Sequence, residues 1–140
     1  MRSSDDKWFE VDQDVWNMFE DYKKIIDILN NDGEDVPVPY VKSKYLAKTV
    51  RFAEYILITQ VPSIPKLHTR GEEEMIINFF YPYFEGESIH AMNSLWTAAE
   101  FLGFKYLSAV SALILFEKIK RKKMKDIDDR SKLLYDMMRM

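Results

Sequence analysis

The sequence predicts one domain that mixes short extended segments with amphipathic helices. The chain of 140 residues has room for a single modest hydrophobic core. Apolar residues make up 47% of the chain and charged residues 31%, which is ordinary globular composition and not that of a disordered chain. Several segments carry apolar residues at helical spacing, whereas others have the β-branched, aromatic or proline-rich pattern of extended backbone.

The N-terminal half is expected to contain extended segments and two helices. Lys7 to Asp12 is rich in β-branched and aromatic residues, which suits one short edge strand. From Val15 to Leu29 the apolar residues recur every three or four positions, which predicts a helix whose charged middle leaves room for a break. The prolines within Val36 to Pro39 require extended backbone. Ser43 is then expected to cap an amphipathic helix that reaches Leu57.

The second half is expected to contain a loop and three helices. Two prolines, Gly71 and three consecutive glutamates lie between Thr59 and Glu74 without a sustained period, which predicts a flexible loop. Beyond it, two apolar stripes separated by Gly103 predict a pair of antiparallel helices. A last helix is expected after the basic run Lys118 to Lys125, with the polar gap Asp128 to Lys132 inside it.

Composition argues against several classes of function. The net charge of −3 gives no support for nucleic-acid binding. The lack of cysteine excludes a thiol nucleophile and cysteine-ligated zinc, and the two histidines, His68 and His90, have no partner set for a metal or a hydrolytic triad. The four glycines form no phosphate-binding loop. We therefore expect no catalysis, no cofactor and no metal site.

Neither export nor a membrane span is indicated. Met1 to Asp6 lacks the apolar stretch of a secretion signal, so we expect an intracellular protein. The most apolar segment, Tyr106 to Phe116, is well short of the roughly 18 to 20 residues that cross a bilayer. The basic run Lys118 to Lys125 has two interpretations: it complements the dipole at the end of a helix, or it serves as a nuclear address or polyanion contact.

Several short motifs follow one another along the chain in an order that can be compared with known families. Ser3 to Asp6 and Phe9 to Asp12 come first, followed by the proline block Val36 to Val41. The acidic stretch Glu72 to Glu74 separates them from Ala98 to Leu107. In sequence and order these pieces resemble the Skp adaptor family, whose members bridge cullin scaffolds to F-box receptors in SCF ubiquitin ligases. The acidic stretch falls where that family has a variable insertion.

The resemblance implies a fold and a division of the chain. The fold would be α/β of the BTB/POZ kind, a small sheet flanked by helices with a C-terminal helical extension. Residues 1–140 would form a single Skp-like domain. Its parts would be an N-terminal half at about 1–58, a variable loop at 59–80, a second half at 81–123 and a partner-binding extension at 124–140.

By the same resemblance, the chain is expected to be a non-catalytic adaptor of the cytoplasm and nucleus that joins a cullin to an F-box protein. Glu100 and Phe101 stand where the family has the Asn-Tyr pair of its cullin-facing surface. The surface expected to bind an F-box is apolar, so we also expect a homodimer when no F-box partner is present. The residues expected to cover an F-box follow Gly103: Leu107, Val110, Leu113, Ile114, Ile119, Met124, Ile127 and Leu134.

Two alternatives stay open at this point. Apolar residues at helical spacing are as typical of a self-contained helical core as of a partner surface, although the apolar tail around Leu133 and Leu134 favours the partner surface. The acidic Glu100 and the tail's departure from the family pattern also allow a second function. That function is a BTB-fold scaffold, or a protein that sequesters F-box receptors and no longer binds cullin.

Overall fold

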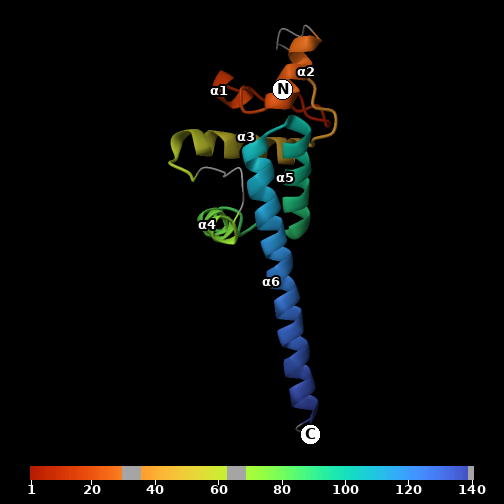
Figure 1. Cartoon of the computed structure of the whole chain (residues 1–140). Coiled ribbons are helices and arrows are strands. Elements are labelled where there is room, and N and C mark those ends of the chain that lie inside the picture. Colours follow the sequence, from red (N-terminus) through yellow and green to blue (C-terminus); the bar gives the residue numbers. More distant parts are fainter. Residues whose placement is uncertain (30–35, 63–68, 139–140) are drawn as a thin grey trace.

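Helices account for the regular secondary structure of the residues that the computed structural model describes, namely 1–29, 36–62 and 69–138. In chain order they are α1 (Gln13–Trp16), α2 (Glu20–Ile28), α3 (Ser43–Ile58), α4 (Arg70–Phe80), α5 (Ile89–Leu102) and α6 (Lys105–Met138). The antiparallel pair α5 and α6 forms the centre, α3 lies across the upper part of that pair, and α4 packs beside α6 (Figure 1). The C-terminal part of α6 extends far beyond the other helices.

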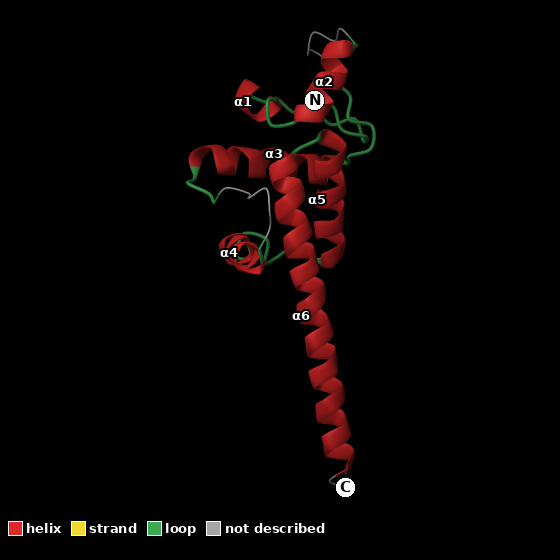
Figure 2. Cartoon of the chain, in the orientation of Figure 1, coloured by secondary structure: helices red, strands yellow, loops and turns green. Residues whose placement is uncertain are grey.

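The small sheet implied by the resemblance is not present in the described residues, so the α/β prediction is wrong and the fold is mostly helical. Figure 2 shows helices joined by loops, without a strand. The predicted edge strand from Lys7 to Asp12 is reduced to a bridge. Arg2 pairs with Trp8 in antiparallel and with Pro37 in parallel orientation, and both are isolated bridges.

The proline block limits how far strand pairing can extend. The backbone N–H of Arg2 donates to the Val36 carbonyl at 2.8 Å, and its carbonyl accepts from the Val38 N–H at 2.7 Å. The groups that face Arg2 come from alternate residues, so Pro37 and Pro39 fall on the opposite edge of the segment, where they offer no N–H to a further strand. The extended backbone predicted for this block is therefore present, but only as a short strap.

The helix predicted from Val15 to Leu29 is divided into α1 and α2 by a break at residues 17–19. At the break, the backbone of Phe19 is not helical, and its side chain is fully buried. The ring packs against Phe104, with 5.5 Å between ring centroids, so burial of an aromatic side chain outweighs an unbroken helix. Leu29, expected on the buried face, is 70% exposed because it follows the last turn of α2.

Helix α3 begins where the sequence predicts, but its cap comes from elsewhere. Ser43 is the first residue of the helix and Lys42 occupies the cap position without a side-chain bond. The carboxylate of Asp5 accepts hydrogen bonds from the Ser43 backbone N–H at 2.7 Å and from its hydroxyl at 2.6 Å. The prediction that Ser43 caps the helix is therefore wrong, since the N-terminal turn supplies the cap.

Helix α4 lies inside the segment predicted as a loop. It begins at Arg70, and the hydroxyl of Thr69 accepts a hydrogen bond from the Glu72 backbone N–H at 3.2 Å. Carboxylates in the first turn of a helix interact favourably with the positive end of its dipole. The glutamates that suggested a loop therefore stabilise the start of α4 instead. The loop prediction is wrong for residues 70–80. Residues 63–68 of that loop, with His68, and residues 30–35 lie outside the described chain.

The helical hairpin predicted around Gly103 is confirmed. Helix α5 is capped by Ser88, whose hydroxyl accepts from the Ala91 N–H, and it ends at Gly103 in the left-handed conformation. The prediction of a separate last helix is wrong, because α6 (Lys105–Met138) runs without a break. A polar gap does not interrupt a helix when the segment contains neither glycine nor proline, as here.

Candidate protein-interaction surface

The C-terminal part of α6 is the most exposed element of the structure. Lys118 is the last buried residue of the helix, and Ile119 is the last that is partly buried. Every residue from 120 to 138, which we call the distal segment, is exposed. At about 1.5 Å per residue, a segment of this length projects roughly 28 Å from the body of the protein. Figure 1 shows it running alone below the other helices.

The residues predicted to cover an F-box all lie on α6, but in two environments. Leu107, Val110 and Ile114 are fully buried in the core of this chain, so the expectation that they are exposed is wrong. Helical spacing could not separate them from surface residues, because the face of α6 that α5 covers and a face that binds a partner show the same spacing of apolar residues. The remaining five are at least partly accessible: Leu113 and Ile119 are half-buried, and Met124, Ile127 and Leu134 are exposed.

A groove lies between α4 and the outer face of α6. It has a volume of about 470 Å³. Its apolar wall includes Ile77 from α4 and Leu113 and Phe116 from α6. Its charged lining consists of Arg70, Glu73, Glu74, Glu117 and Lys120. Sequence reasoning missed Phe116, which is 60% exposed; its spacing of three from Leu113 was the available signal.

The groove continues into an apolar stripe that follows the outer face of α6 to its end. Successive members lie three or four residues apart, as neighbours on one face of a helix must. Two of the positions are polar and the others apolar. We call this set the outer stripe: Leu113, Phe116, Lys120, Met124, Ile127, Ser131, Leu134 and Met138.

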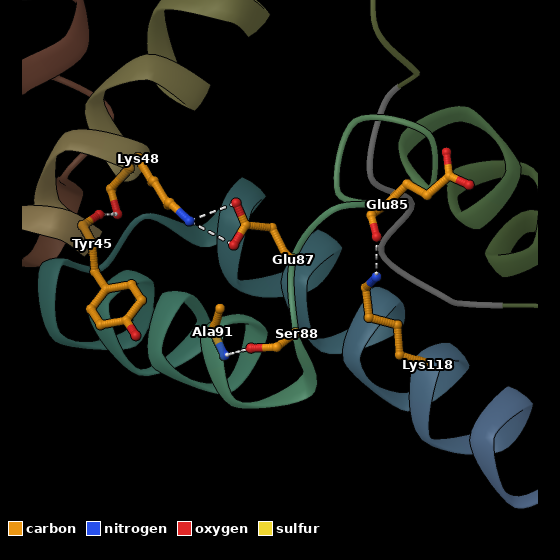
Figure 3. A network of polar contacts seen from close by, with 8 residues as sticks. Tyr45, Lys48, Glu85, Glu87, Ser88, Ala91 and Lys118 are labelled. Atoms are coloured by element: carbon orange, nitrogen blue, oxygen red, sulfur yellow. Dashed lines mark hydrogen bonds and ion pairs between the residues drawn. The ribbon is translucent and has the colours of Figure 1, made fainter.

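A buried cation fixes α6 at the point where it leaves the body. The ammonium of Lys118 donates to the Glu85 carbonyl at 3.4 Å (Figure 3). It also lies 5.0 Å from the centroid of the Tyr81 ring. The guanidinium of Arg121 lies over the same ring at 3.8 Å. Burial lowers the pKa of the Lys118 ammonium below its ordinary value. These contacts hold the base of the distal segment against the turn that follows α4.

The same turn is tied to α3. The ammonium of Lys48 donates to both carboxylate oxygens of Glu87 at 2.6 Å, as Figure 3 shows. Glu87 immediately precedes Ser88, the cap of α5. The ion pair therefore connects α3 to the start of α5, and the outer stripe rests on a body whose helices are linked to one another.

The two residues expected at the cullin-facing surface are neighbours on α5 but have different surroundings. A carboxylate oxygen of Glu100 accepts from the Trp96 indole N–H at 3.2 Å and from the Ser108 hydroxyl on α6. The ring of Phe101 packs against Tyr22, 5.3 Å between centroids, and Tyr40, 5.4 Å. Glu100 is exposed, whereas Phe101 is half-covered by aromatic residues of the N-terminal half.

The described residues contain neither a cluster of metal ligands nor a membrane-spanning helix. Among them no group of three or more aspartate, glutamate or histidine side chains could hold a metal ion. No helix in residues 1–29, 36–62 and 69–138 is long and apolar enough to span a membrane. The roles assigned to the F-box and cullin residues are not tested by these placements and stay predictions.

Comparison with known families assigns the N-terminal part of the chain. Residues 1–57 match the Skp1 family, tetramerisation domain. The match covers α1, α2 and nearly all of α3, and it confirms the resemblance drawn from the sequence. No curated protein matches the chain. Helices α4 and α6, which carry the groove and the outer stripe, lie beyond the matched residues, as does α5.

Proposed function

Because residues 1–57 match the tetramerisation domain of the Skp1 family, we propose that the chain is a divergent Skp1-like protein and acts as a non-catalytic adaptor that bridges a cullin scaffold to F-box substrate receptors. The family match is the observation that carries this proposal. Protein–protein interaction is the coarse function that the match supports. The two specific partners rest on the predicted surfaces, one on α6 and one on α5.

The F-box side of the proposal is supported by the exposed part of α6. Met124, Ile127 and Leu134 are each at least 57% exposed, and they lie on one face of a helix that no other described element covers. Apolar side chains at this spacing are what a helical partner needs in order to pack against a groove and stripe. The half-buried Leu113 would extend that contact into the groove beside α4.

The cullin side is supported by contact between α5 and the matched domain. Tyr22 and Tyr40, which cover Phe101, both lie within residues 1–57. A cullin that contacts the matched domain next to these rings would therefore also reach Phe101 and Glu100. The exposed carboxylate of Glu100 would then require a cation or a hydrogen-bond donor on the cullin.

A second candidate is a scaffold that sequesters F-box receptors without a cullin. It is favoured by Glu100, because an acidic side chain at a contact surface excludes partners that present an apolar or acidic group there. In this case the contacts of Glu100 with Trp96 and Ser108 would serve only to join α5 to α6. We further propose that the protein acts in the cytoplasm and nucleus, supported by the exposed cations of Lys120 to Lys125.

Reconstitution with purified partners tests both candidates. The full chain is co-expressed with a minimal F-box domain, purified by gel filtration, and then mixed with the N-terminal domain of a cullin. A stable ternary complex supports the adaptor, and an F-box complex that excludes the cullin supports the sequestering scaffold. Failure to bind an F-box domain contradicts both. Leu134→Asp should abolish F-box binding.

The matched control is Leu133→Asp. Leu133 and Leu134 are consecutive, and their side chains are 61% and 60% exposed, but only Leu134 belongs to the outer stripe. The two variants therefore carry the same added charge at positions about 100° apart around one helix. Equal loss of binding in both would show that charge alone, and not the stripe, governs the complex.

A further inference from the structure

The outer stripe faces away from the core of the protein along the whole of its length. At about 100° per residue, its eight positions fall within an arc of about 80°. The buried residues Leu107, Ile114 and Lys118 lie on the opposite side of α6. From Leu113 to Met138 the stripe spans 26 residues, or about 39 Å of helix, which is between three and four heptads. A helix of comparable length could pack along it.

The order of residues in the outer stripe is almost the same in both directions. Three apolar pairs alternate with two polar positions: Leu113 and Phe116, then Lys120, Met124 and Ile127, then Ser131, Leu134 and Met138. The midpoint falls between Lys125 and Asp126. Rotation of the helix by 180° about this midpoint superposes apolar pair on apolar pair and Lys120 on Ser131. Such a pattern matches an interface formed by two copies of one surface.

We propose that the outer stripe binds the outer stripe of a second copy of this chain, with the two α6 helices antiparallel. Met124 of each copy then packs against Ile127 of the other, at the centre of the pair. Leu113 packs against Met138 of the second copy at each end. The bodies of the two copies lie at opposite ends of the pair, where they do not compete for space.

The polar positions of the stripe distinguish antiparallel from parallel pairing. In a parallel pair with the same register, the ammonium of Lys120 would face the Lys120 ammonium of the second copy across an apolar interface. Repulsion between two desolvated cations disfavours that arrangement. In the antiparallel pair Lys120 lies opposite Ser131, whose hydroxyl can accept a hydrogen bond from the ammonium. A single cation also keeps its long stem against the apolar neighbours.

The charged residues on either side of the outer stripe also favour antiparallel pairing. Arg121 and Asp128 lie on one flank and at nearly the same level of the antiparallel pair, twice, so Asp128 of one copy adds a carboxylate near the Arg121 guanidinium that Tyr81 and Glu117 of the other copy already hold. Lys123 and Arg130 meet on the other flank, which offsets part of this gain. At the centre of the pair, however, the basic residues Lys122 to Lys125 lie level with the acidic run Asp126 to Asp129 of the second copy.

The groove beside α4 extends the contact at each end of the pair. Leu113 and Phe116 form part of its wall together with Ile77. The end of the second copy's α6 reaches this level, so its Leu134 and Met138 enter the groove. The distal segment of each copy, which is exposed on every side in one chain, is thereby covered. This inference concerns the chain alone and does not rest on the proposed binding of an F-box or a cullin.

Cysteine cross-linking tests the orientation, because the natural chain contains no cysteine. The full chain is prepared as two single variants, Lys120→Cys and Ser131→Cys, and each is treated with a short bis-maleimide linker. Antiparallel pairing predicts rapid cross-linking in the mixture of the two variants and slow cross-linking of either alone. Rapid cross-linking of each variant with itself would establish parallel pairing and overturn the proposal.

Sedimentation equilibrium of the unmodified chain tests whether the pair exists. We expect a species of twice the 16.7 kDa chain mass, in a concentration-dependent equilibrium with the monomer. Ile127→Asp should reduce association at least about tenfold, since it places two carboxylates at the centre of the pair. Leu133→Asp, off the stripe, should leave association unchanged. A chain that stays monomeric at all concentrations, or equal losses in both variants, would overturn the proposal.

Discussion

The backbone of Gly103 packs directly against Asp21, so that the turn between α5 and α6 touches the first turn of α2. Gly103 has a φ of 67°, in the left-handed region that favours glycine. A Cβ atom at this position would lie 2.5 Å from the Asp21 Cβ and 2.7 Å from its backbone nitrogen. The contact therefore requires both the conformation and the small size of glycine.

Replacing Gly103 with alanine should destabilise the protein strongly. The left-handed backbone alone costs roughly 1–2 kcal/mol for a residue with a Cβ, and the displacement of α2 adds to it. We expect the free energy of unfolding, measured in urea, to fall by more than about 2 kcal/mol. Gly86→Ala is the control, because no atom lies within 4 Å of its Cβ position. Similar losses in the two variants would contradict this role for Gly103.

The cap that Asp5 provides to α3 should make folding stability depend on pH at the acidic end. Hydrogen bonds from the Ser43 side chain, the Ser3 hydroxyl and the Ser43 backbone hold the pKa of the Asp5 carboxyl well below its ordinary 3.8. Because the folded-state pKa is the lower one, the stabilisation is complete above about pH 4. It declines as the pH falls through 3.8 towards the folded-state value.

Thermal unfolding between pH 2 and pH 7 measures this effect. Asp5→Ala should lower the melting temperature at pH 7, and the difference from the natural chain should narrow as the pH falls. Asp6→Asn is a suitable control, since Asp6 lies in the same turn without a bond to Ser43 and asparagine tolerates its left-handed φ of 60°. A difference that stays constant over the whole range would show that the Asp5 charge does not act through the cap.

Local patterns predicted most of the helices but missed α4, and the sheet that the resemblance implied is not present in the described residues. The hairpin at Gly103 follows from two apolar stripes and a left-handed glycine, both of which are local features. The sheet was implied by resemblance, and the paired segments form only isolated bridges; Pro37 and Pro39 offer no N–H to a further strand on the outer edge. The break before Phe19 depends on its packing against Phe104, a contact between residues far apart in sequence that spacing cannot reveal.

The candidate site was predicted in part, for a related reason. Spacing placed the apolar residues on faces of α6 but could not say which face α5 covers, so buried Leu107 and exposed Leu134 were assigned one role. The sequence did not indicate at which residue α6 leaves the packed helices. That point is set by Lys118, whose ammonium reaches the Glu85 carbonyl, and the basic composition of the segment did not indicate a buried cation.

The difference between these two leucines gives a further prediction. Leu107→Ala removes a fully buried side chain and should cost about 2–5 kcal/mol in the free energy of unfolding. Leu134→Ala removes an exposed side chain and should change it by no more than about 0.5 kcal/mol. Urea unfolding at a concentration at which the chain is monomeric measures both. A large loss of stability in Leu134→Ala would mean that the distal segment contacts the body in solution.

Lys120 should limit the strength of self-association, because it is the one charged side chain in the outer stripe. Lys120→Leu replaces a cation with an apolar residue at two symmetry-related places in the antiparallel pair. Burial of each leucine contributes about 1.5–3 kcal/mol, so the dissociation constant should fall at least about tenfold. Sedimentation equilibrium measures the change. Lys122→Leu, which lies off the stripe on the same exposed turn, should have little effect, and an equal gain would indicate unspecific hydrophobic association.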